Sequence, residues 1–282
     1  MAPRPRRGES EEPDTRSVRP RIVDPPIPDE VTPADLPKDV RNDLRTLTAE
    51  NQEHVARHLA MAARLIEADP EAAHRHAQAA SRRGGRIGVV RETLAITAYR
   101  TGDYGLALRE LRTYRRITGR DDQLPLMVDS ERGLGRPQRA LELGRSVPRG
   151  TLPVPVQVEL AIAMSGARLD LGQAAQALVE LEIPQLDPDV AYSWSPGLFD
   201  AYATVLEELG RDAEAAEWFR RAEVAAAALD GAADDDDDED LIEVVELDPE
   251  VPEAAEASAE ADGAASDGAA DDTPGSAAGA AE

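Results

Sequence analysis

The feature that most limits how this chain can fold is a small residue that recurs between apolar stretches of helical spacing. It occurs at five positions, separated by 34, 33, 37 and 38 residues, and an alanine follows each one five residues later. Small residues in this phase let two helices joined by a tight turn approach closely. The sequence therefore predicts five helix–turn–helix units, with turns at Ala68, Gly102, Gly135, Gly172 and Gly210 and phased alanines at Ala73, Ala107, Ala140, Ala177 and Ala215.

The third unit is the least regular of the five, and both of its helices are predicted to be short. Pro125 falls within its first helix, and Gly144 and Pro148 end its second helix early. Gly144 also fits poorly at a position that is apolar in most units, nine residues after the turn. A capping helix is expected over residues 37–48. The units themselves are expected at about 49–82, 87–118, 122–147 and 156–182, with a fifth that follows the loop 184–196 and ends near Ala228.

Composition separates two tails from this helical domain. Residues 1–36 contain eight prolines and six arginines, which predicts a disordered arm, although its apolar part at 20–28 could instead lie along the first unit. Residues 230–282 hold 20 acidic residues and no basic one, out of a net charge of −25. Such a composition cannot form a packed core. The predicted domains are therefore a disordered arm at 1–36, a helical domain at 37–230 and a disordered acidic tail at 231–282.

The order Phe199, Tyr202, Gly210, Ala215, Phe219 resembles a tetratricopeptide repeat (TPR), a helix–turn–helix unit of about 34 residues. With its alanine-rich units, single lysine and acidic tail, the chain is similar to TPR-like proteins of high-GC, actinobacterial-type bacteria. The resemblance implies an all-α solenoid of about five repeats. It also implies a groove, lined by the first helix of each pair, that binds peptides or protein surfaces and has no catalytic role.

The resemblance implies groove residues at the positions of this chain that match the first helix of each TPR unit. Some TPR proteins hold a peptide's terminal carboxylate there with lysines and asparagines. This chain has none in those places, because Lys38, Asn42 and Asn51 precede the first groove. A carboxylate clamp is therefore not expected. The partner-groove candidates are His58, Glu92, Tyr99, Asp129, Arg132, Asp200 and Glu207, with Ala62, Ile96, Ile162 and Thr204 beside them.

A basic stretch offers a second kind of site. Residues 74–120 contain eleven arginines and three acidic residues. Three interpretations stay open: a solvated face, a site for an acidic segment of a partner or of the chain's own tail, and a nucleic-acid surface. Residues 241–247 could dock the tail on the repeats, or the tail could only solubilise the protein. The basic-patch candidates are Arg82, Arg83, Arg86, Arg109, Arg112 and Arg116.

The sequence shows no catalytic constellation. His54 and His58, four residues apart, could share a helix face and hold a metal, but Val55 rules out the H-E-x-x-H pattern of zinc proteases. Together with His74 and His76, they are expected to be surface residues without a ligand. Cysteine is absent, which excludes disulfides and thiolate sites. No metal site, cofactor or enzymatic activity is therefore expected, and a histidine-metal enzyme is the weakest alternative.

These observations favour a cytoplasmic, non-catalytic adaptor that presents a helical groove to a protein or peptide partner. The start of the chain has no apolar run that would act as a secretory signal, and no stretch is long and apolar enough to span a membrane. The alternative is an RNA- or ribosome-associated factor that uses the arginines of residues 74–120. The identity of the partner is not encoded in any motif.

Overall fold

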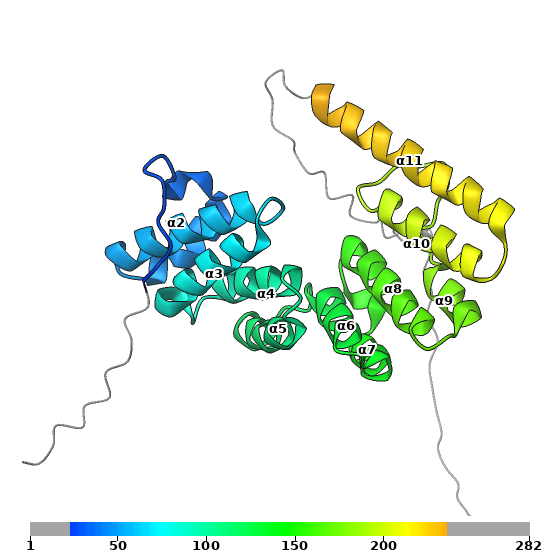
Figure 1. Ribbon diagram of the computed structural model, residues 1–282, viewed down its shortest axis with the longest axis horizontal. Coiled ribbons are helices and arrows are strands. Elements are labelled where there is room, and N and C mark those ends of the chain that lie inside the picture. The colour runs from blue at the N-terminus through cyan, green and yellow to red at the C-terminus, as the bar shows by residue number, and fades with distance from the viewer. Residues whose placement is uncertain (1–22, 236–282) are drawn as a thin grey trace, which may run out of the picture. The chain divides into compact units, whose positions relative to one another are not determined.

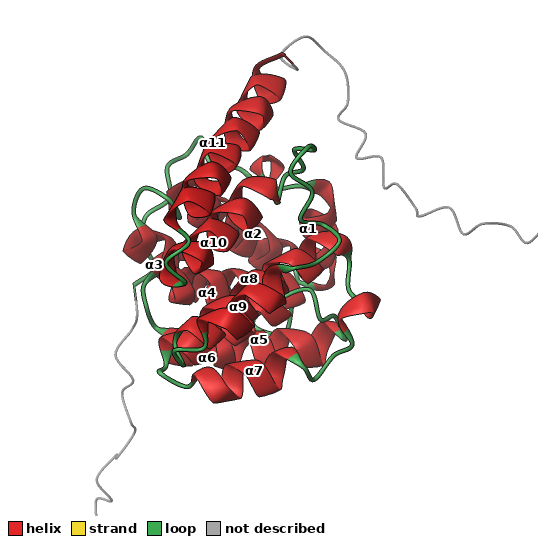
Figure 2. Ribbon diagram, turned by 90° about the vertical axis from the view of Figure 1, so that its right-hand side faces the viewer, coloured by secondary structure: helices red, strands yellow, loops and turns green. Residues whose placement is uncertain are grey.

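The computed structural model describes residues 23–235, and all regular elements in that range are helices (Figures 1 and 2). The prediction of an all-α fold is confirmed. The chain divides into two units, Met1–Asp238 and Glu239–Glu282. The second unit lies outside the described residues, as does most of the predicted acidic tail. All features below belong to the first unit.

Ten of the helices form five consecutive helix pairs, each joined by a short turn (Figure 1). Short elements precede the first pair: η1 (Pro33–Asp35), α1 (Lys38–Asp43) and η2 (Leu44–Thr46). A further turn, η3 (Arg149–Thr151), stands before the fourth pair. The pairs are α2 (Ala49–Leu65) with α3 (Pro70–Gly84), α4 (Gly88–Arg100) with α5 (Tyr104–Thr118), α6 (Leu124–Gly133) with α7 (Pro137–Gly144), α8 (Val154–Leu169) with α9 (Ala174–Leu181), and α10 (Ser195–Glu208) with α11 (Asp212–Asp235).

Four of the five turns share one hydrogen-bonding pattern. At the turn between α8 and α9, Gly172 has a φ of 68°. Its N–H donates to Leu169 O at 2.8 Å, and the next N–H, of Gln173, donates to Arg168 O at 2.9 Å. This is the Schellman arrangement, which needs a left-handed residue that only glycine adopts without strain. Gly102, Gly135 and Gly210 repeat both bonds.

The first turn is built differently, because Ala68 stands where the others have glycine. Here the N–H groups of Ala68 and Asp69 both donate to Leu65 O, at 3.1 and 2.7 Å. Asp69 then caps α3 by accepting from Ala72 N at 2.9 Å, and Pro70 occupies the first position of that helix. Asp103 caps α5 in the same way after Gly102, so the first turn differs from the second in its Leu65 contacts and in the absence of the glycine.

The phased alanines are buried on the second helix of each pair. Four of the five have no exposed surface. In the fourth pair, the hydroxyl of Ser165 on α8 donates to the carbonyl of Ala177 on α9 at 3.0 Å. Such a contact between a short side chain and the facing backbone requires closely spaced helices. The alanines therefore set the spacing within each pair.

Gly144, the poor fit of the third pair, has a packing reason. It is buried at the end of α7, and a Cβ atom added there would collide with the sulfur of Met164 on α8. The Met164 side chain fills the place that an apolar side chain takes in other pairs. Both helices of the third pair are short, as predicted: α6 has 10 residues and α7 has 8.

The buried apolar side chains form several clusters rather than one core. One cluster joins α8 and α9 to α10 and α11, another joins α6 and α7 to α8, and a third joins the N-terminal elements to α2, α3 and α4. Each cluster is therefore shared between consecutive pairs. No pair packs by itself, which is the dependence expected of stacked repeats.

Polar contacts also join consecutive pairs, and they link residues about one unit apart. Arg100, at the end of α4 in the second pair, binds Glu67, which lies 33 residues earlier, just after α2 in the first pair. Gln123 donates to Glu92 at 2.7 Å across 31 residues. The same separation therefore recurs in both the apolar phasing and the polar links.

Residues 23–36 are not a disordered arm, so that prediction was wrong for this segment. Val31 and Leu36 are buried in the cluster that includes α2. Arg57 on α2 donates to the carbonyls of Val31 and Pro28 at 2.8 and 3.0 Å, which anchors the segment through its backbone. The segment instead lies along the first pair, the weaker alternative drawn from its apolar residues. Residues 1–22 lie outside the described residues.

Three helix boundaries differ from the prediction. Helix α1 covers only Lys38–Asp43 of the expected capping helix, and a short 3-10 turn follows it. Helix α8 begins at Val154, two residues before the expected start of the fourth unit, because Pro155 is tolerated in its first turn. Helix α11 continues to Asp235, past the expected end near Ala228 and into the predicted tail. The alanines at 225–228 have a high helix propensity, which favours continuation of the helix beyond them.

The alanine contact can be tested within one helix. We expect Ala177→Leu to destabilise the protein by about 1–3 kcal/mol, because a larger side chain overpacks a closely spaced interface. Ala175 is exposed on the same helix, so Ala175→Leu should change stability by no more than about 0.5 kcal/mol. Urea unfolding followed by circular dichroism measures both. Equal midpoints for the two variants would contradict a spacing role for Ala177.

Candidate functional site

Three predicted groove residues, Tyr99, Asp129 and Arg132, lie together and are joined by Asp170. Tyr99 belongs to α4, Asp129 and Arg132 lie one turn apart on α6, and Asp170 follows the last residue of α8. The first helices of the second, third and fourth pairs thus each contribute to one site. These four residues are called the Arg132 cluster below.

Arg132 is held by carboxylates on two sides. Its Nε and one terminal nitrogen donate to the two oxygens of Asp170, at 2.8 and 3.2 Å. The other terminal nitrogen donates to Asp129 Oδ1 at 2.5 Å. Burial by itself would lower the pKa of Arg132, but the hydrogen bonds and charges of Asp170 and Asp129 outweigh it and raise the pKa. The guanidinium is therefore charged, fixed in orientation and already paired.

Tyr99 completes the hydrogen bonding of Asp129. Its hydroxyl donates to Asp129 Oδ2, and its ring packs edge-on against Tyr104 with the ring centres 5.4 Å apart. Burial, and then the hydrogen bond to Asp129, raise the pKa of Tyr99 well above its usual value. The phenol therefore stays protonated, and it acts as a hydrogen-bond donor that connects α4 to α6.

Two helical glycines make room for these side chains. A Cβ atom at Gly166 on α8 would collide with the guanidinium of Arg132, and one at Gly133 would lie 2.6 Å from ring atoms of Tyr104. Neither glycine is in a turn, so neither is needed for its backbone conformation. Their role is close approach: Arg132 and Tyr104 lie directly against helix backbones.

The Arg132 cluster borders a cavity of about 580 Å³. Asp129, Arg132 and Asp170 line it, together with Tyr104 and the start of α7 at Pro137 and Gln138. Two carboxylates and one guanidinium give this lining a net charge of −1. Each carboxylate oxygen accepts one hydrogen bond within the cluster and can accept another. The cavity is therefore suited to groups that donate hydrogen bonds.

The remaining groove candidates are dispersed. Glu92 on α4 is half-buried and accepts from Gln123, and burial followed by the nearby charge of Asp122 raises its pKa. Asp200 and Glu207 are exposed on α10. Ala62 and Ile96 line a separate apolar cavity of about 330 Å³ beside α1 and α2. The structure thus assembles part of the predicted groove into one site and leaves the rest apart.

Most of the basic patch is paired with acidic residues. Arg82 binds Asp24, Arg83 binds Glu50, Arg109 binds Glu110, and Arg112 binds Glu131. For Arg86 and Arg116, the structure shows no ion pair with a described residue. Six of the eleven arginines of residues 74–120 bind acidic groups outside that stretch, namely Asp24, Glu50, Glu67, Asp121, Asp122 and Glu131. The excess positive charge counted along the sequence is therefore largely neutralised in space.

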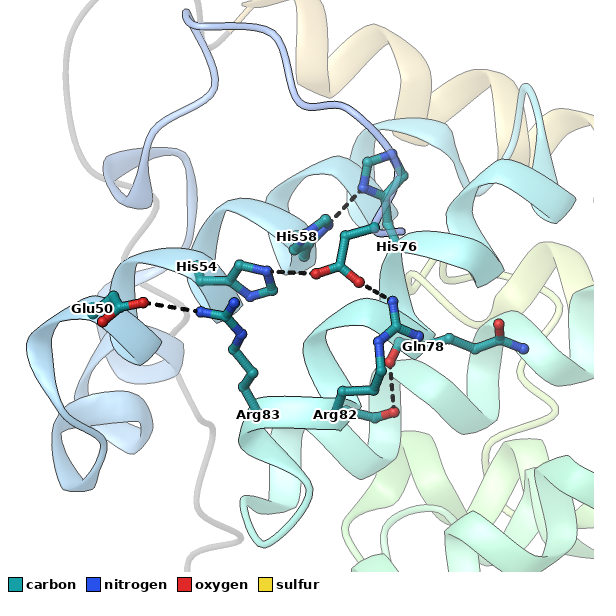
Figure 3. Close-up of polar contacts among 9 residues, drawn as sticks. Glu50, His54, His58, His76, Gln78, Arg82 and Arg83 are labelled. Carbon is teal, nitrogen blue, oxygen red and sulfur yellow. Dashed lines mark hydrogen bonds and ion pairs between the residues drawn. The ribbon is translucent and has the colours of Figure 1, made fainter. Parts of the chain in front are cut away.

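The expectation of surface histidines was wrong for two of the four. His58 and His76 are only 2% and 4% exposed, and their Nδ1 atoms are 2.9 Å apart (Figure 3). Burial, and then the positive charges of neighbouring groups, lower the pKa of His58 to about 4, and burial also lowers that of His76. Both rings are therefore neutral at pH 7. His58 does not line an open groove.

His54 lies beside this buried pair. Its ring centre is 4.5 Å from that of His58, and its Nε2 is 3.0 Å from Asp24 Oδ2. Asp24 also accepts from Arg82, and these bonds tie the N-terminal segment to α2 and α3. The histidine cluster is defined as Asp24, His54, His58, His76 and Arg82. His74 is elsewhere, bound to Thr97 and Gln78.

Asp170 and Asp24 were not predicted from the sequence. Only Asp170 has a sequence spacing that could have identified it. Asp170 follows Arg132 by 38 residues, about one unit, and stands two residues before the turn glycine Gly172. A search for opposite charges one unit apart would have found it. Asp24 is in a segment without helical periodicity, so no spacing connects it to His54.

Comparisons with known proteins assign no family. No family model matches the chain, and no curated protein matches its sequence. Among residues 23–235, no helix combines the length and the apolar character required to cross a bilayer. Any statement of function therefore depends on the residues and contacts described above.

The raised pKa of Glu92 predicts a pH-dependent stability difference. A carboxyl group with a raised pKa favours folding when protonated, and that contribution is lost as the pH rises through its folded-state pKa. Glu92→Gln removes the charge and retains an oxygen to accept from Gln123. We expect it to increase the free energy of unfolding at pH 7 by about 0.5–2 kcal/mol, the usual range for relieving an unfavourable charge.

The difference between Glu92→Gln and the parent should vanish near pH 4, where both side chains are neutral. Urea unfolding at pH 4, 5.5 and 7 measures it, and Glu142→Gln, at an exposed position on α7, is the matched control. A Glu92→Gln protein that is less stable than the parent at pH 7 would show that the ionised carboxylate is stabilising.

Proposed function

We propose that this chain is a non-catalytic scaffold of TPR-like repeats that binds a protein or peptide segment on its first helices. We further propose that it acts in the cytoplasm, which its cysteine-free sequence fits. The support for TPR-like repeats is the coincidence of three features in consecutive helix pairs. These are the turn spacing, the buried alanines and the sharing of apolar clusters between neighbours.

The observation that carries the binding role is the cavity beside the Arg132 cluster. Its charged groups come from α6 and from the end of α8, which are first helices of two successive pairs, and the TPR resemblance assigns a ligand groove to first helices. The groups are held in fixed orientations by hydrogen bonds between these helices. Tyr104 and Gln138 add polar groups from the second helices α5 and α7. Preorganised polar groups in a concave site bind a partner at low entropic cost.

The charge of the site favours a particular partner chemistry. Arg132 is already bound by Asp129 and Asp170, so it does not offer a free cation to a terminal carboxylate. The carboxylate oxygens instead offer acceptor positions with a net negative charge. A segment with lysine, arginine or free backbone N–H groups therefore fits the cavity better than an acidic segment.

An RNA- or ribosome-associated role has less support. Backbone phosphates need unpaired cationic side chains, and the arginines proposed for this role are largely bound to carboxylates. An acidic tail that masks or only solubilises the scaffold is compatible with either role. Because α11 continues to Asp235, a tail deletion should begin after residue 238 and not at 231.

Affinity capture from a lysate of the cells that encode the protein tests the groove. We expect Asp170→Asn to weaken capture of a protein partner roughly tenfold, or about 1.4 kcal/mol, because it removes one charged acceptor from the cavity. Glu142→Gln makes the same charge change outside the cavity and should capture the partner like the parent. Mass spectrometry with and without nuclease identifies and quantifies the bound protein.

Two outcomes would overturn the proposal. Equal capture by Asp170→Asn and Glu142→Gln would remove the cavity as the binding site. Capture that disappears with nuclease would transfer the function to RNA. In that case the arginine variants Arg109→Gln and Arg112→Gln should reduce binding and its salt dependence.

A further inference from the structure

The histidine cluster has no part in the proposed groove, yet it gathers ligand-type side chains from separate parts of the chain. His54 and His58 stand one turn apart on α2 and point to the same side (Figure 3). Asp24 reaches them from the N-terminal segment, 30 residues earlier in the sequence than His54. We propose that Asp24, His54 and His58 bind one transition metal ion of the zinc class. This departs from the expectation of no metal site.

The distances fit a shared ion. One ligand atom from each of the three residues lies within 4.8 Å of the other two. Asp24 Oδ2 and His54 Nε2 are 3.0 Å apart. Ligands bound at about 2.0–2.2 Å from a tetrahedral zinc ion are themselves separated by about 3.3–3.6 Å. A small closure of His58 therefore suffices to bring all three atoms into one coordination sphere.

The hydrogen bonds around the three residues resemble the support that metal ligands usually have. A bond between the Nδ1 atoms of His58 and His76 leaves Nε2 as the free ring nitrogen of His58. Arg82 holds the second oxygen of Asp24 and fixes the carboxylate towards His54. Outer partners of this kind orient ligands and select the tautomer. His76 and Arg82 are thus positioning residues and not ligands.

In the metal-free arrangement, one ring nitrogen of His54 has a hydrogen-bond partner and the other has none among the described residues. Its Nδ1 atom is buried and has no hydrogen-bond partner among the described residues. The contact with Asp24 is therefore the single side-chain hydrogen bond that the structure gives this ring. Binding of an ion at Nε2 breaks the hydrogen bond to Asp24 and moves the ring proton of His54 to Nδ1. In exchange, the ion is coordinated by three residues.

The donor set also determines the class of ion. Two imidazoles and one carboxylate suit Zn²⁺, Co²⁺ or Ni²⁺, whereas Mg²⁺ and Ca²⁺ prefer sites made of oxygen atoms. The Arg82 guanidinium contributes a positive charge beside the site. It therefore lowers affinity for any cation, and the imidazole nitrogens must supply the selectivity. A bound ion would strengthen the attachment of residues 23–36 to α2. Arg57 already contributes to this attachment through its hydrogen bonds to the segment's backbone.

Metal titration of the full chain, stripped with a chelator, tests the site. Visible absorption reports Co²⁺ coordination, and calorimetry reports the stoichiometry of Zn²⁺ binding. We expect one ion per chain, intense cobalt bands, and a higher thermal midpoint with Zn²⁺. A tenfold excess of Mg²⁺ should not compete, which separates this site from carboxylates elsewhere in the chain.

The variants Asp24→Asn and His54→Gln each remove one ligand from a partly exposed position. We expect each to weaken Zn²⁺ binding at least tenfold and to abolish the thermal shift, with an unchanged circular dichroism spectrum. His74→Gln is the matched control, because His74 belongs to the same helix pair and hydrogen-bonds to Thr97 and Gln78 outside the cluster. It should bind Zn²⁺ like the parent.

Three results would overturn the proposal. The first is the absence of saturable Co²⁺ or Zn²⁺ binding by the folded parent chain. The second is equal affinity in the parent, Asp24→Asn and His54→Gln, which would place the ion elsewhere. The third is an equal loss of affinity in His74→Gln, which would indicate a nonspecific effect of histidine removal.

Discussion

The close approach of paired helices is the constraint on which the rest of this structure depends. It is set by buried alanines such as Ala177, which leave the facing backbone within hydrogen-bond reach of Ser165. Closely paired helices bury little apolar area of their own, because alanine side chains are small. Each pair must therefore share its apolar surface with the next pair. This explains why the core is divided into clusters that cross pair boundaries.

The same thin packing explains the many polar links between pairs. Where large apolar side chains are scarce, partly buried charged groups meet across the helices, and they require partners. Arg132 between Asp129 and Asp170 is the most developed example, and it borders a cavity. The histidine cluster is a second example, with buried imidazoles in place of a guanidinium. Both candidate sites thus arise where polar side chains occupy positions between helices.

Much of the helical framework could be predicted from the sequence because its signals are local. A glycine such as Gly172 ends a helix through its own backbone, and a proline such as Pro70 begins one, so the helix pairs were placed within a few residues. Part of the Arg132 cluster was also predicted, because Tyr99, Asp129 and Arg132 share the phase of the first helices. The assignment of these repeats to the TPR family stays a prediction.

The remaining features depended on contacts that no local pattern encodes. The sequence predicted an excess of positive charge over residues 74–120, because the carboxylate partners of these arginines lie up to 58 residues away. Asp24, the partner of Arg82, is the most distant. The burial of His58 depends on packing among α2, α3 and the N-terminal segment, which the proline content of that segment concealed. The roles of Gly166 and Gly133 could not be predicted, because no sequence pattern distinguishes a glycine that lets a side chain approach the helix backbone.

The recurrence of contacts at a separation of about one unit has a consequence for how the chain acquires its structure. Contacts such as those of Glu50, Glu67 and Glu92 close loops of only about one unit, so modest loop-closure entropy opposes their formation. Chains of such low contact order fold rapidly, and they can do so from the N-terminus as the ribosome extends them. The first pair and its histidine cluster can therefore assemble while the residues of the last pairs are still being translated.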